Sequence, residues 1–157
     1  MKKHITNGVT ETHFEPNGIC NRAQAVTFLW RAAGSPKPIS SENPFVDVNE
    51  GSFYYDAVLW AVEEGITNGL DGTHFGPYVE CTRAQVVTFL WREAAENEPA
   101  AIAANEFSDV EAGKWYSDAI DWAVAQGIAN GLDDGTFGVA DSCNRAQVVT
   151  FLYRADN

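Results

Sequence analysis

Residues 68–95 read NGLDGTHFGPYVECTRAQVVTFLWREAA, and this stretch occurs in three related copies along the chain. The other two copies begin at Asn7 and Asn130, so the starting points are spaced by about sixty residues. Self-similarity at a fixed period is the sequence signature of a repeat architecture, in which each unit packs against its neighbours. The chain of 157 residues is therefore predicted to be a tandem array of small units.

Two of the three copies are preceded by a matching front half. Residues 45–67 read FVDVNEGSFYYDAVLWAVEEGIT, and residues 107–129 read FSDVEAGKWYSDAIDWAVAQGIA. In the first copy only Ile5 and Thr6 match this half, so we expect the first repeat to lack its front helix. The connecting segments are rich in Pro, Ser and Asn, which is typical of loops. The predicted division is a partial first repeat at 5–34, whole repeats at 45–95 and 107–157, and linkers at 35–44 and 96–106.

Each whole repeat contains two helical patterns separated by a turn-rich loop. In the second repeat the back helix is predicted over 83–95, where apolar residues recur at helical spacing and form one stripe. The front helix is predicted over 54–64, and Gly65 stands where a helix-ending glycine is expected. The predicted fold class is mainly α, built from tandem helix-loop-helix repeats.

The start of the back helix carries the most specific local motif. Thr82 and Gln85 are spaced as a capping box, in which each side chain accepts a hydrogen bond from the other residue's backbone N–H. The residue before each cap is a cysteine: Cys20, Cys81 and Cys143. We interpret these cysteines as small buried apolar residues. A three-cysteine metal site is conceivable, but nothing in the sequence brings the three together.

Arginine occupies the first position of every back helix, at Arg22, Arg83 and Arg145. Free amides at a helix N-terminus, combined with a fork-shaped guanidinium, form a natural site for an anion. The competing interpretation is an internal ion pair with Asp47 or Asp109, which lie in the Phe-x-Asp-Val turns of the front halves. One arginine can serve both purposes, so both interpretations stay open.

Two columns of aromatic residues lie off the main apolar stripes. Trp60 and Trp122 belong to the front helices, and Phe28, Phe89 and Phe151 belong to the back helices. One interpretation is that each helix is covered on two sides by neighbouring repeats. The other is a platform on which a sugar ring stacks, and the two tryptophans are the better candidates for that role.

The chain is strongly acidic, with a formal net charge of −12 at pH 7. Long-range repulsion therefore argues against nucleic acid and bare membrane surfaces as partners. No apolar run is long enough to span a bilayer, and the basic start is not followed by the apolar stretch of a signal peptide. If the protein acts outside the cell, we expect its export signal to lie outside this sequence.

The sequence predicts no catalytic activity, no metal and no cofactor. It contains no nucleophile elbow, no zinc signature and no phosphate-binding loop. His13 and His74 hold the same repeat position, which indicates a loop surface rather than a catalytic pair. The stretch from Asp47 begins like a calcium loop, but its twelfth position is Val58, where such a loop needs glutamate.

The ordered elements Phe-x-Asp-Val, Gly-Ile, Asn-Gly, Asp-Gly-Thr and Thr-Arg-Ala-Gln resemble the S-layer homology repeat over nearly the whole chain outside the linkers. Members of that family usually carry three modules, and they anchor surface proteins to bacterial cell-wall polysaccharides, often ones with a pyruvate ketal. The resemblance implies a pseudo-threefold central bundle of front helices, with loops and back helices as surrounding prongs. It also implies that ligands lie in grooves between the prongs and contact Arg22, Arg83 and Arg145.

On this resemblance we expect a non-covalent, extracellular cell-wall anchor that binds an anionic polysaccharide, such as a pyruvylated one. Glycine lets a backbone approach a ligand closely, so the Asn-Gly pairs are expected to shape the groove walls. The family's usual Glu is Gln in this chain, which preserves the capping box and removes a negative charge beside each arginine. The ligand-binding set predicted in addition to the arginines and tryptophans is Asn68, Gly69, Asn130, Gly131, Gln85 and Gln147.

The missing front half of the first repeat is the main departure from the family pattern. It leaves the expected bundle one helix short and exposes an apolar seam. A partner helix or self-association could cover that seam, or the sequence is an excerpt of a longer protein. The alternative function is therefore a protein-interaction scaffold built from degenerate repeats. The third repeat also has Val139 where the others have Pro16 and Pro77, so we expect its loop to differ.

Overall fold

The computed structural model describes residues 5–10, 12–94 and 106–157. Within these ranges the chain forms five α-helices: α1 (Arg22–Ala32), α2 (Tyr55–Glu63), α3 (Arg83–Ala94), α4 (Ser117–Ala125) and α5 (Arg145–Ala155). The same ranges contain three isolated β-bridges and no extended strand. The mainly helical fold class is therefore confirmed. Of the linker predicted at 96–106, all but the last residue lies outside the described residues.

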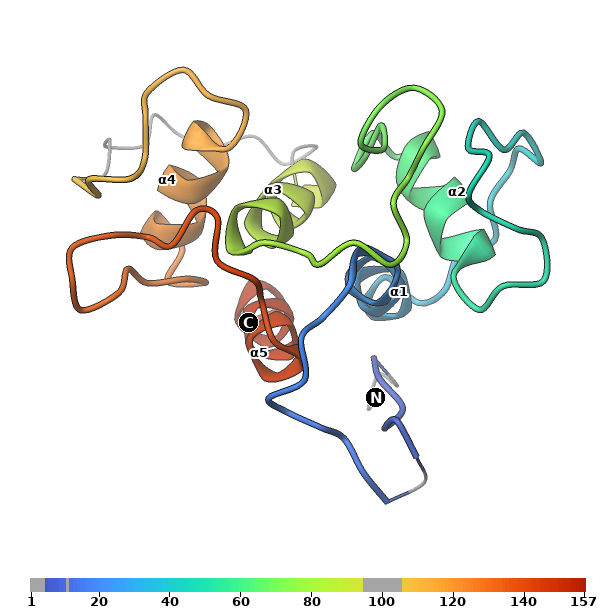
Figure 1. Ribbon diagram of the computed structural model, residues 1–157, viewed down its shortest axis with the longest axis horizontal. Helices are drawn as coiled ribbons and strands as arrows, with labels where there is room; N and C mark the ends of the chain where they lie inside the picture. Colours follow the sequence, from blue (N-terminus) through green and yellow to red (C-terminus); the bar gives the residue numbers. More distant parts are fainter. Residues whose placement is uncertain (1–4, 11, 95–105) are drawn as a thin grey trace.

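The back helices α1, α3 and α5 meet at the centre of the molecule, and the front helices α2 and α4 lie outside them (Figure 1). Helix α2 packs on α1, and α4 packs on α3, so each front helix covers the back helix of the preceding repeat. The expectation that front helices form the central bundle is therefore wrong. Among the described residues only the back helix occurs three times, so only back helices can surround a threefold axis there.

A closed ring of backbone hydrogen bonds joins the three repeats just before the back helices begin. The N–H of Cys20 donates to the carbonyl of Cys143 at 2.9 Å, Cys81 donates to Cys20 at 2.9 Å, and Cys143 donates to Cys81 at 2.8 Å. The pseudo-threefold arrangement thus brings together three cysteines that the sequence alone did not connect. All three are fully buried, as predicted. Burial raises the pKa of the Cys20 and Cys143 thiols to about 12.

The helix ends follow the local sequence signals. The side chains of Thr82 and Gln85 each accept the other residue's backbone N–H, at 3.2 and 3.0 Å, and both asparagine-capped helices form the same box. Gly65, with φ of 68°, follows α2, and the N–H of Ile66 bonds back to the carbonyl of Ala61 at 2.8 Å. This is the glycine-ended turn that the sequence predicted.

The core lies between the central helices and the inner sides of the front helices and loops. Phe75 and Phe137, from the loops that precede α3 and α5, are fully buried in it. Complete burial of a phenylalanine side chain stabilises a fold by roughly 2–3 kcal/mol, so these rings hold the loops onto the bundle. No helix in the described part of the chain has both the length and the apolar character needed to cross a bilayer.

Candidate functional site

The arginine that begins each back helix reaches into the loop of the next repeat. Arg22 is 2% exposed, and its Nε donates to the carbonyl oxygen of Phe75 at 2.9 Å. Its guanidinium carbon lies 4.8 Å from the centroid of the Phe75 ring and 5.6 Å from that of Phe89. Arg83 and Arg145 make the corresponding contacts. A charge-assisted hydrogen bond and a cation–π contact therefore cross each boundary between repeats.

These contacts explain the phenylalanines that lie off the apolar stripe of the back helices. Each of these phenylalanines lies near the arginine of the preceding repeat, and the third repeat precedes the first around the axis. The pairs are Phe89 with Arg22, Phe151 with Arg83, and Phe28 with Arg145. The interpretation that the back helices are covered on a second side by neighbouring repeats is thus supported for this column.

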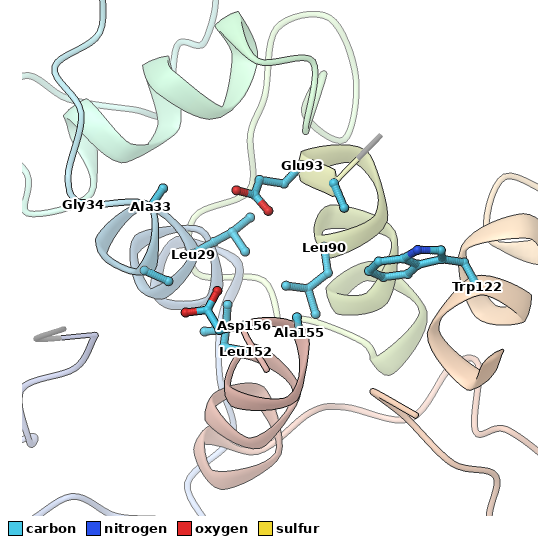
Figure 2. Close-up of a pocket in the computed structure, with 11 residues that line it drawn as sticks. Leu29, Ala33, Gly34, Leu90, Glu93, Trp122, Leu152, Ala155 and Asp156 are labelled. Atoms are coloured by element: carbon cyan, nitrogen blue, oxygen red, sulfur yellow. The ribbon is translucent and has the colours of Figure 1, made fainter. Parts of the chain in front are cut away.

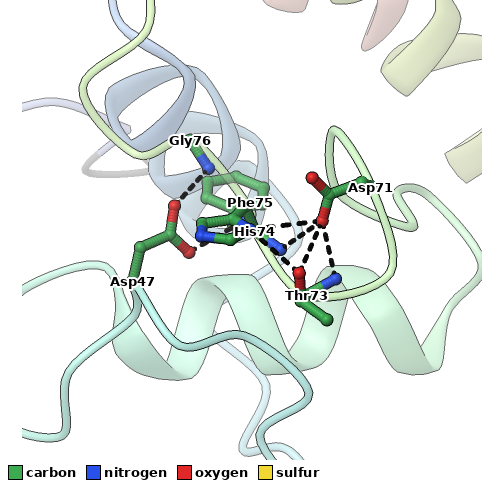
Figure 3. Close-up of polar contacts among 6 residues, drawn as sticks. All are labelled: Asp47, Asp71, Thr73, His74, Phe75 and Gly76. Carbon is green, nitrogen blue, oxygen red and sulfur yellow. Dashed lines mark hydrogen bonds and ion pairs between the residues drawn. The ribbon is translucent and has the colours of Figure 1, made fainter.

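An aspartate binds the same loop through backbone N–H groups, whereas the arginine binds a backbone carbonyl (Figure 3). The carboxylate of Asp47 accepts hydrogen bonds from the N–H groups of Phe75 and Gly76, each at 2.8 Å. Arg22 donates to the carbonyl of the same Phe75. The negative Asp47 thus binds the N–H of this residue, and the positive Arg22 binds its C=O. Among the described residues the two side chains form no direct ion pair, which corrects that expectation.

The corresponding aspartate of the third repeat makes one additional bond. Asp109 accepts N–H groups from Phe137, Gly138 and Val139, at 2.7, 2.8 and 2.9 Å. The third bond exists because Val139 has a backbone N–H where proline has none. Burial alone would raise the pKa of Asp109, but these amides outweigh it and lower the pKa. The prediction that this loop differs is confirmed, and the difference is local.

The amides at the start of α1 already have partners inside the protein. The N–H of Arg22 donates to the carbonyl of Val79 at 2.9 Å, and that of Ala23 donates to Pro77 at 3.0 Å. The capping box holds the third amide. The prediction that free helix amides bind an external anion is therefore wrong here. Loop carbonyls of the next repeat occupy the place of the anion, because they carry the partial negative charge that a helix N-terminus attracts.

A groove of about 410 Å³ lies between α1, the loop 67–70 and α3, and we call it the Arg22 groove. Its lining consists of Arg22, Thr67, Asn68, Gly69, Leu70, Gln85, Thr88, Phe89, Arg92 and Trp115. The structure thus brings together four of the predicted ligand-binding residues: Arg22, Asn68, Gly69 and Gln85. No lining residue is acidic, although the chain contains 22 aspartates and glutamates.

Arg22 differs from the other two helix-starting arginines at its Nη2 atom. Nη2 of Arg83 donates to the carbonyl of Asn130 at 2.8 Å, and Nη2 of Arg145 donates to that of Asn7 at 3.2 Å. Nη2 of Arg22 is buried and has no hydrogen-bond partner within the described residues. A buried donor left in this state costs about 1–3 kcal/mol, which an acceptor entering the groove would recover. Burial also lowers the pKa of Arg22.

Gln85, Arg92 and Trp115 also line the groove. Oε1 of Gln85 accepts the N–H of Thr82 at 3.0 Å, so the amide nitrogen is the end of this side chain left for a ligand. Arg92 donates through Nη1 to the carbonyl of Ile66 at 3.0 Å and adds a second positive charge. Trp115 is 54% exposed and supplies an aromatic surface beside these groups.

The tryptophans predicted as a sugar platform lie elsewhere. Trp60 is 5% exposed and belongs to the core. Trp122 lines a separate cavity of about 230 Å³ at the C-terminal ends of the central helices, together with Leu29 and Leu90 (Figure 2). Burial excludes Trp60 as a platform for a sugar ring, whereas the role of Trp122 stays a prediction, at a cavity other than the Arg22 groove. The tryptophan that lines the Arg22 groove is Trp115. The sequence feature that could have indicated it is the aromatic pair before each front helix, Phe53-Tyr54 and Trp115-Tyr116.

The predicted residues of the third repeat surround Arg83 rather than the Arg22 groove. Asn130 offers its carbonyl to Arg83, and Gln147 completes the capping box of α5. A Cβ atom at Gly131 would lie 2.1 Å from Cε1 of Phe107, and one at Gly69 would lie 2.5 Å from Cε1 of Phe45. Both glycines are therefore required by an aromatic ring of their own repeat, and Gly69 also borders the groove.

The chain matches one known family. The model of the S-layer homology domain matches residues 44–87 and 106–149. A cell surface protein of Thermoanaerobacter kivui is 33% identical over 134 residues, which are 83% of this chain and 17% of that protein. A surface-layer 125 kDa protein of Lysinibacillus sphaericus is 30% identical over 130 residues, 82% of this chain and 11% of that protein.

An enzyme is also among the relatives. An amylopullulanase of Thermoanaerobacterium thermosulfurigenes is 28% identical over 155 residues, which are 96% of this chain but 8% of the enzyme. The chain therefore spans only a small part of the length of each of these curated relatives. The likeness to the enzyme is confined to its S-layer homology part.

Proposed function

This chain belongs to the S-layer homology family, and from that premise we propose that it is a non-covalent cell-surface anchoring module that binds an anionic cell-wall polysaccharide in the Arg22 groove. One observation carries the proposal: the groove is lined by two arginines and no carboxylate, in a chain with a net charge of −12. Most of this acidic protein repels an anionic ligand, so an acid-free surface with two arginines is where such a ligand binds.

The ligand chemistry follows from the atoms left unused in the groove. A carboxylate on the glycan, such as that of a pyruvate ketal, accepts from Nη2 of Arg22 and from the amide nitrogen of Gln85. Hydrogen bonds between an arginine and a carboxylate are about twice as strong as neutral ones. The apolar face of a sugar ring packs on Trp115, which is exposed at the edge of the groove. A repetitive glycan that engages several modules adds avidity to a weak single site.

We place the protein outside the cell, at the wall. The names of two relatives, a cell surface protein and a surface-layer protein, support this location. The test of the function is sedimentation with purified cell-wall sacculi, before and after acid removes the polysaccharide. We expect the chain to pellet with intact sacculi and to stay in solution with stripped ones. Equal pelleting with both preparations would overturn the proposal.

A substitution in the groove tests the site itself. Trp115→Ala removes the aromatic surface, and we expect sacculus binding to weaken roughly fivefold, since such contacts contribute about 1 kcal/mol. Tyr153→Ala is the matched control, because Tyr153 is an exposed aromatic residue on α5 that does not line the groove. Unchanged binding by Trp115→Ala would remove the Arg22 groove from the mechanism.

The alternative function, a protein-interaction scaffold, has one observation in its favour. Part of the surface of α5 is exposed where the corresponding surfaces of α1 and α3 are buried. A surface of this kind is compatible with wall binding, because it does not overlap the lining of the Arg22 groove.

A further inference from the structure

Asparagine is followed by glycine at several exposed places in the chain. Asparagine in this setting is open to deamidation, because glycine has no side chain to obstruct the attack of its backbone nitrogen on the neighbouring side-chain amide. The structure surrounds the peptide groups of these pairs differently, so it predicts different rates. The asparagines concerned, all exposed, are Asn7, Asn17, Asn68 and Asn130.

The pair at Asn68 is protected by the residue before it. The attacking atom would be the backbone nitrogen of Gly69, and its N–H donates to Oγ1 of Thr67 at 3.1 Å. This hydrogen bond must break before the nitrogen can lose its proton and turn toward the side chain. Nη2 of Arg22, which has no partner among the described residues, does not bond to the carbonyl of Asn68. The peptide group is therefore blocked at its nitrogen and receives no help from Nη2 at its oxygen.

The pair at Asn130 differs at both atoms. Ala129 stands where the second repeat has a threonine, and the N–H of Gly131 has no acceptor within the described part of the chain. Nη2 of Arg83 donates to the carbonyl of Asn130 at 2.8 Å. This carbonyl and the Gly131 nitrogen belong to one peptide group. A guanidinium at the oxygen stabilises the negative charge that the group acquires when its nitrogen loses a proton.

We propose that Asn130 is a deamidation site, promoted by Arg83, at the boundary between the second and third repeats. Hydroxide removes the proton of the Gly131 nitrogen, which then forms a bond to Cγ of Asn130. The bond from Cγ to the side-chain nitrogen breaks, and ammonia leaves with a proton from water, which regenerates the hydroxide. One water opens the resulting succinimide ring at either carbonyl, giving aspartate or isoaspartate. The net reaction consumes one water and releases one ammonia.

The isoaspartyl product would disturb the contact between these repeats. It diverts the main chain through the side-chain carbon, so the backbone becomes one atom longer beside the carbonyl that Arg83 binds. The backbone has little room to move, because a Cβ atom at Gly131 would lie 2.1 Å from Cε1 of Phe107. We therefore expect the Arg83 bond to weaken as the product forms. This inference rests on the fold and does not depend on the polysaccharide proposal.

The test is a comparison of deamidation rates in the folded and the unfolded chain. The full chain is kept in mildly alkaline buffer, with and without urea, and each site is followed by peptide mapping and tandem mass spectrometry. We expect the ratio of folded to unfolded rate to be highest at Asn130. Asn7 should come next, since its carbonyl is 3.2 Å from Nη2 of Arg145. Asn17 and Asn68 should be slowest, because the N–H of the following glycine is hydrogen-bonded in each.

Two reciprocal substitutions test the role of the hydroxyl group. Ala129→Thr supplies the acceptor that the third repeat lacks and should slow deamidation of Asn130 roughly fivefold, the effect of one ordinary hydrogen bond. Thr67→Ala should accelerate deamidation of Asn68 by a similar factor. Each new residue already occupies the equivalent buried position in the other repeat, so both variants should keep the folded circular dichroism spectrum.

A third substitution tests the role of the guanidinium. Arg83→Lys keeps the positive charge but removes Nη2, so Asn130 should react more slowly in the folded variant. A looser loop alone would have the opposite effect, because freedom of the backbone makes the attack easier. The direction of the change therefore separates promotion by Arg83 from a purely structural role.

Three results would overturn the proposal. The first is a folded-to-unfolded rate ratio at Asn130 that is no higher than the ratio at Asn68. The second is an unchanged Asn130 rate in Ala129→Thr, measured on a chain that circular dichroism shows to be folded. The third is faster or equal deamidation in folded Arg83→Lys, which would remove Arg83 from the reaction. Since none of these measurements involves sacculi, their failure is distinguishable from failure of the polysaccharide site.

Discussion

Arg22 and Arg83 hold the same repeat position and share most of their environment, yet they differ by one hydrogen bond. Each donates through Nε to a phenylalanine carbonyl at 2.9 Å, and each guanidinium lies 4.8 Å from that phenylalanine's ring centroid. Nη2 of Arg83 is bonded to the carbonyl of Asn130, whereas Nη2 of Arg22 has no partner in the described chain. The comparison separates the arginine's structural role, through Nε, from the ligand role that we propose for Nη2.

The third arginine lies between these two cases. Nη2 of Arg145 is 3.2 Å from the carbonyl of Asn7 and 3.4 Å from the hydroxyl of Thr6, which are longer contacts than that of Arg83. The Nε bond is constant across the repeats, and the Nη2 bond varies. Substitutions that act on Nε should therefore affect stability in every repeat, and those that act near Nη2 should affect binding in one.

The largest expected effect is on stability. Arg83→Ala removes two charge-assisted hydrogen bonds, to the carbonyls of Phe137 and Asn130, and should lower the free energy of unfolding by about 3–5 kcal/mol. Arg22→Ala removes one such bond and also an unpaired donor, so we expect a loss of about 2 kcal/mol. Urea denaturation followed by circular dichroism measures both. Equal losses would show that the Nη2 bond of Arg83 contributes nothing to the fold.

A smaller effect is expected on binding from a pair of identical substitutions. Gln85→Glu places a negative charge in the Arg22 groove, where it repels an anionic ligand and competes for Arg22, so sacculus binding should weaken roughly tenfold. Gln147→Glu is the matched control beside Arg83, and it should change binding much less. Both variants retain the capping box, so their unfolding free energies should stay within about 0.5 kcal/mol of the original. Equal losses of binding in the two variants would show that ligand binds beside both Arg22 and Arg83.

The smallest effect concerns the loop that borders the Arg22 groove. Asp71 accepts the N–H and hydroxyl of Thr73 and the N–H of His74 (Figure 3), and these bonds, led by the Thr73 amide, lower its pKa to about 2. An unfolded aspartate titrates near pH 4, so the stabilisation is complete above about pH 4 and is lost as the pH falls through about 2.

The acid sensitivity of this loop can be measured by an NMR titration of the Asp71 carboxyl carbon. We expect a midpoint near 2, with amide shifts of Thr73 and His74 following the same curve. The Asp71→Asn variant should lose this transition at the two amides. A midpoint near 4 would contradict the hydrogen-bonded geometry.

The repeat, the helices and their caps could be predicted from the sequence because these features are local. The capping boxes need two side chains three residues apart, and the end of α2 needs one glycine. The sequence also placed an arginine at the first position of each back helix, and the structure confirms these helix starts.

The packing between repeats could not be predicted in the same way. Both helix types have an apolar stripe, so periodicity alone does not show which of them surrounds the axis. The copy number did contain that information, because the back-half sequence occurs three times and the front-half sequence twice. The helix amides and Trp60 were misassigned for a related reason: their partners come from residues distant in sequence, and a single repeat gives no sign of them.

The ring of hydrogen bonds through the three cysteines has a consequence for how many repeats such a module can hold. Each cysteine N–H and each cysteine carbonyl in the ring is used once, so the first and third repeats are as directly joined as any consecutive pair. An open array of repeats can be lengthened at either end, but a closed ring cannot. Every cysteine N–H of the ring already donates to a carbonyl of the ring, so a fourth back helix could join it only by displacing one of the three. We therefore expect an additional repeat to lie outside this ring.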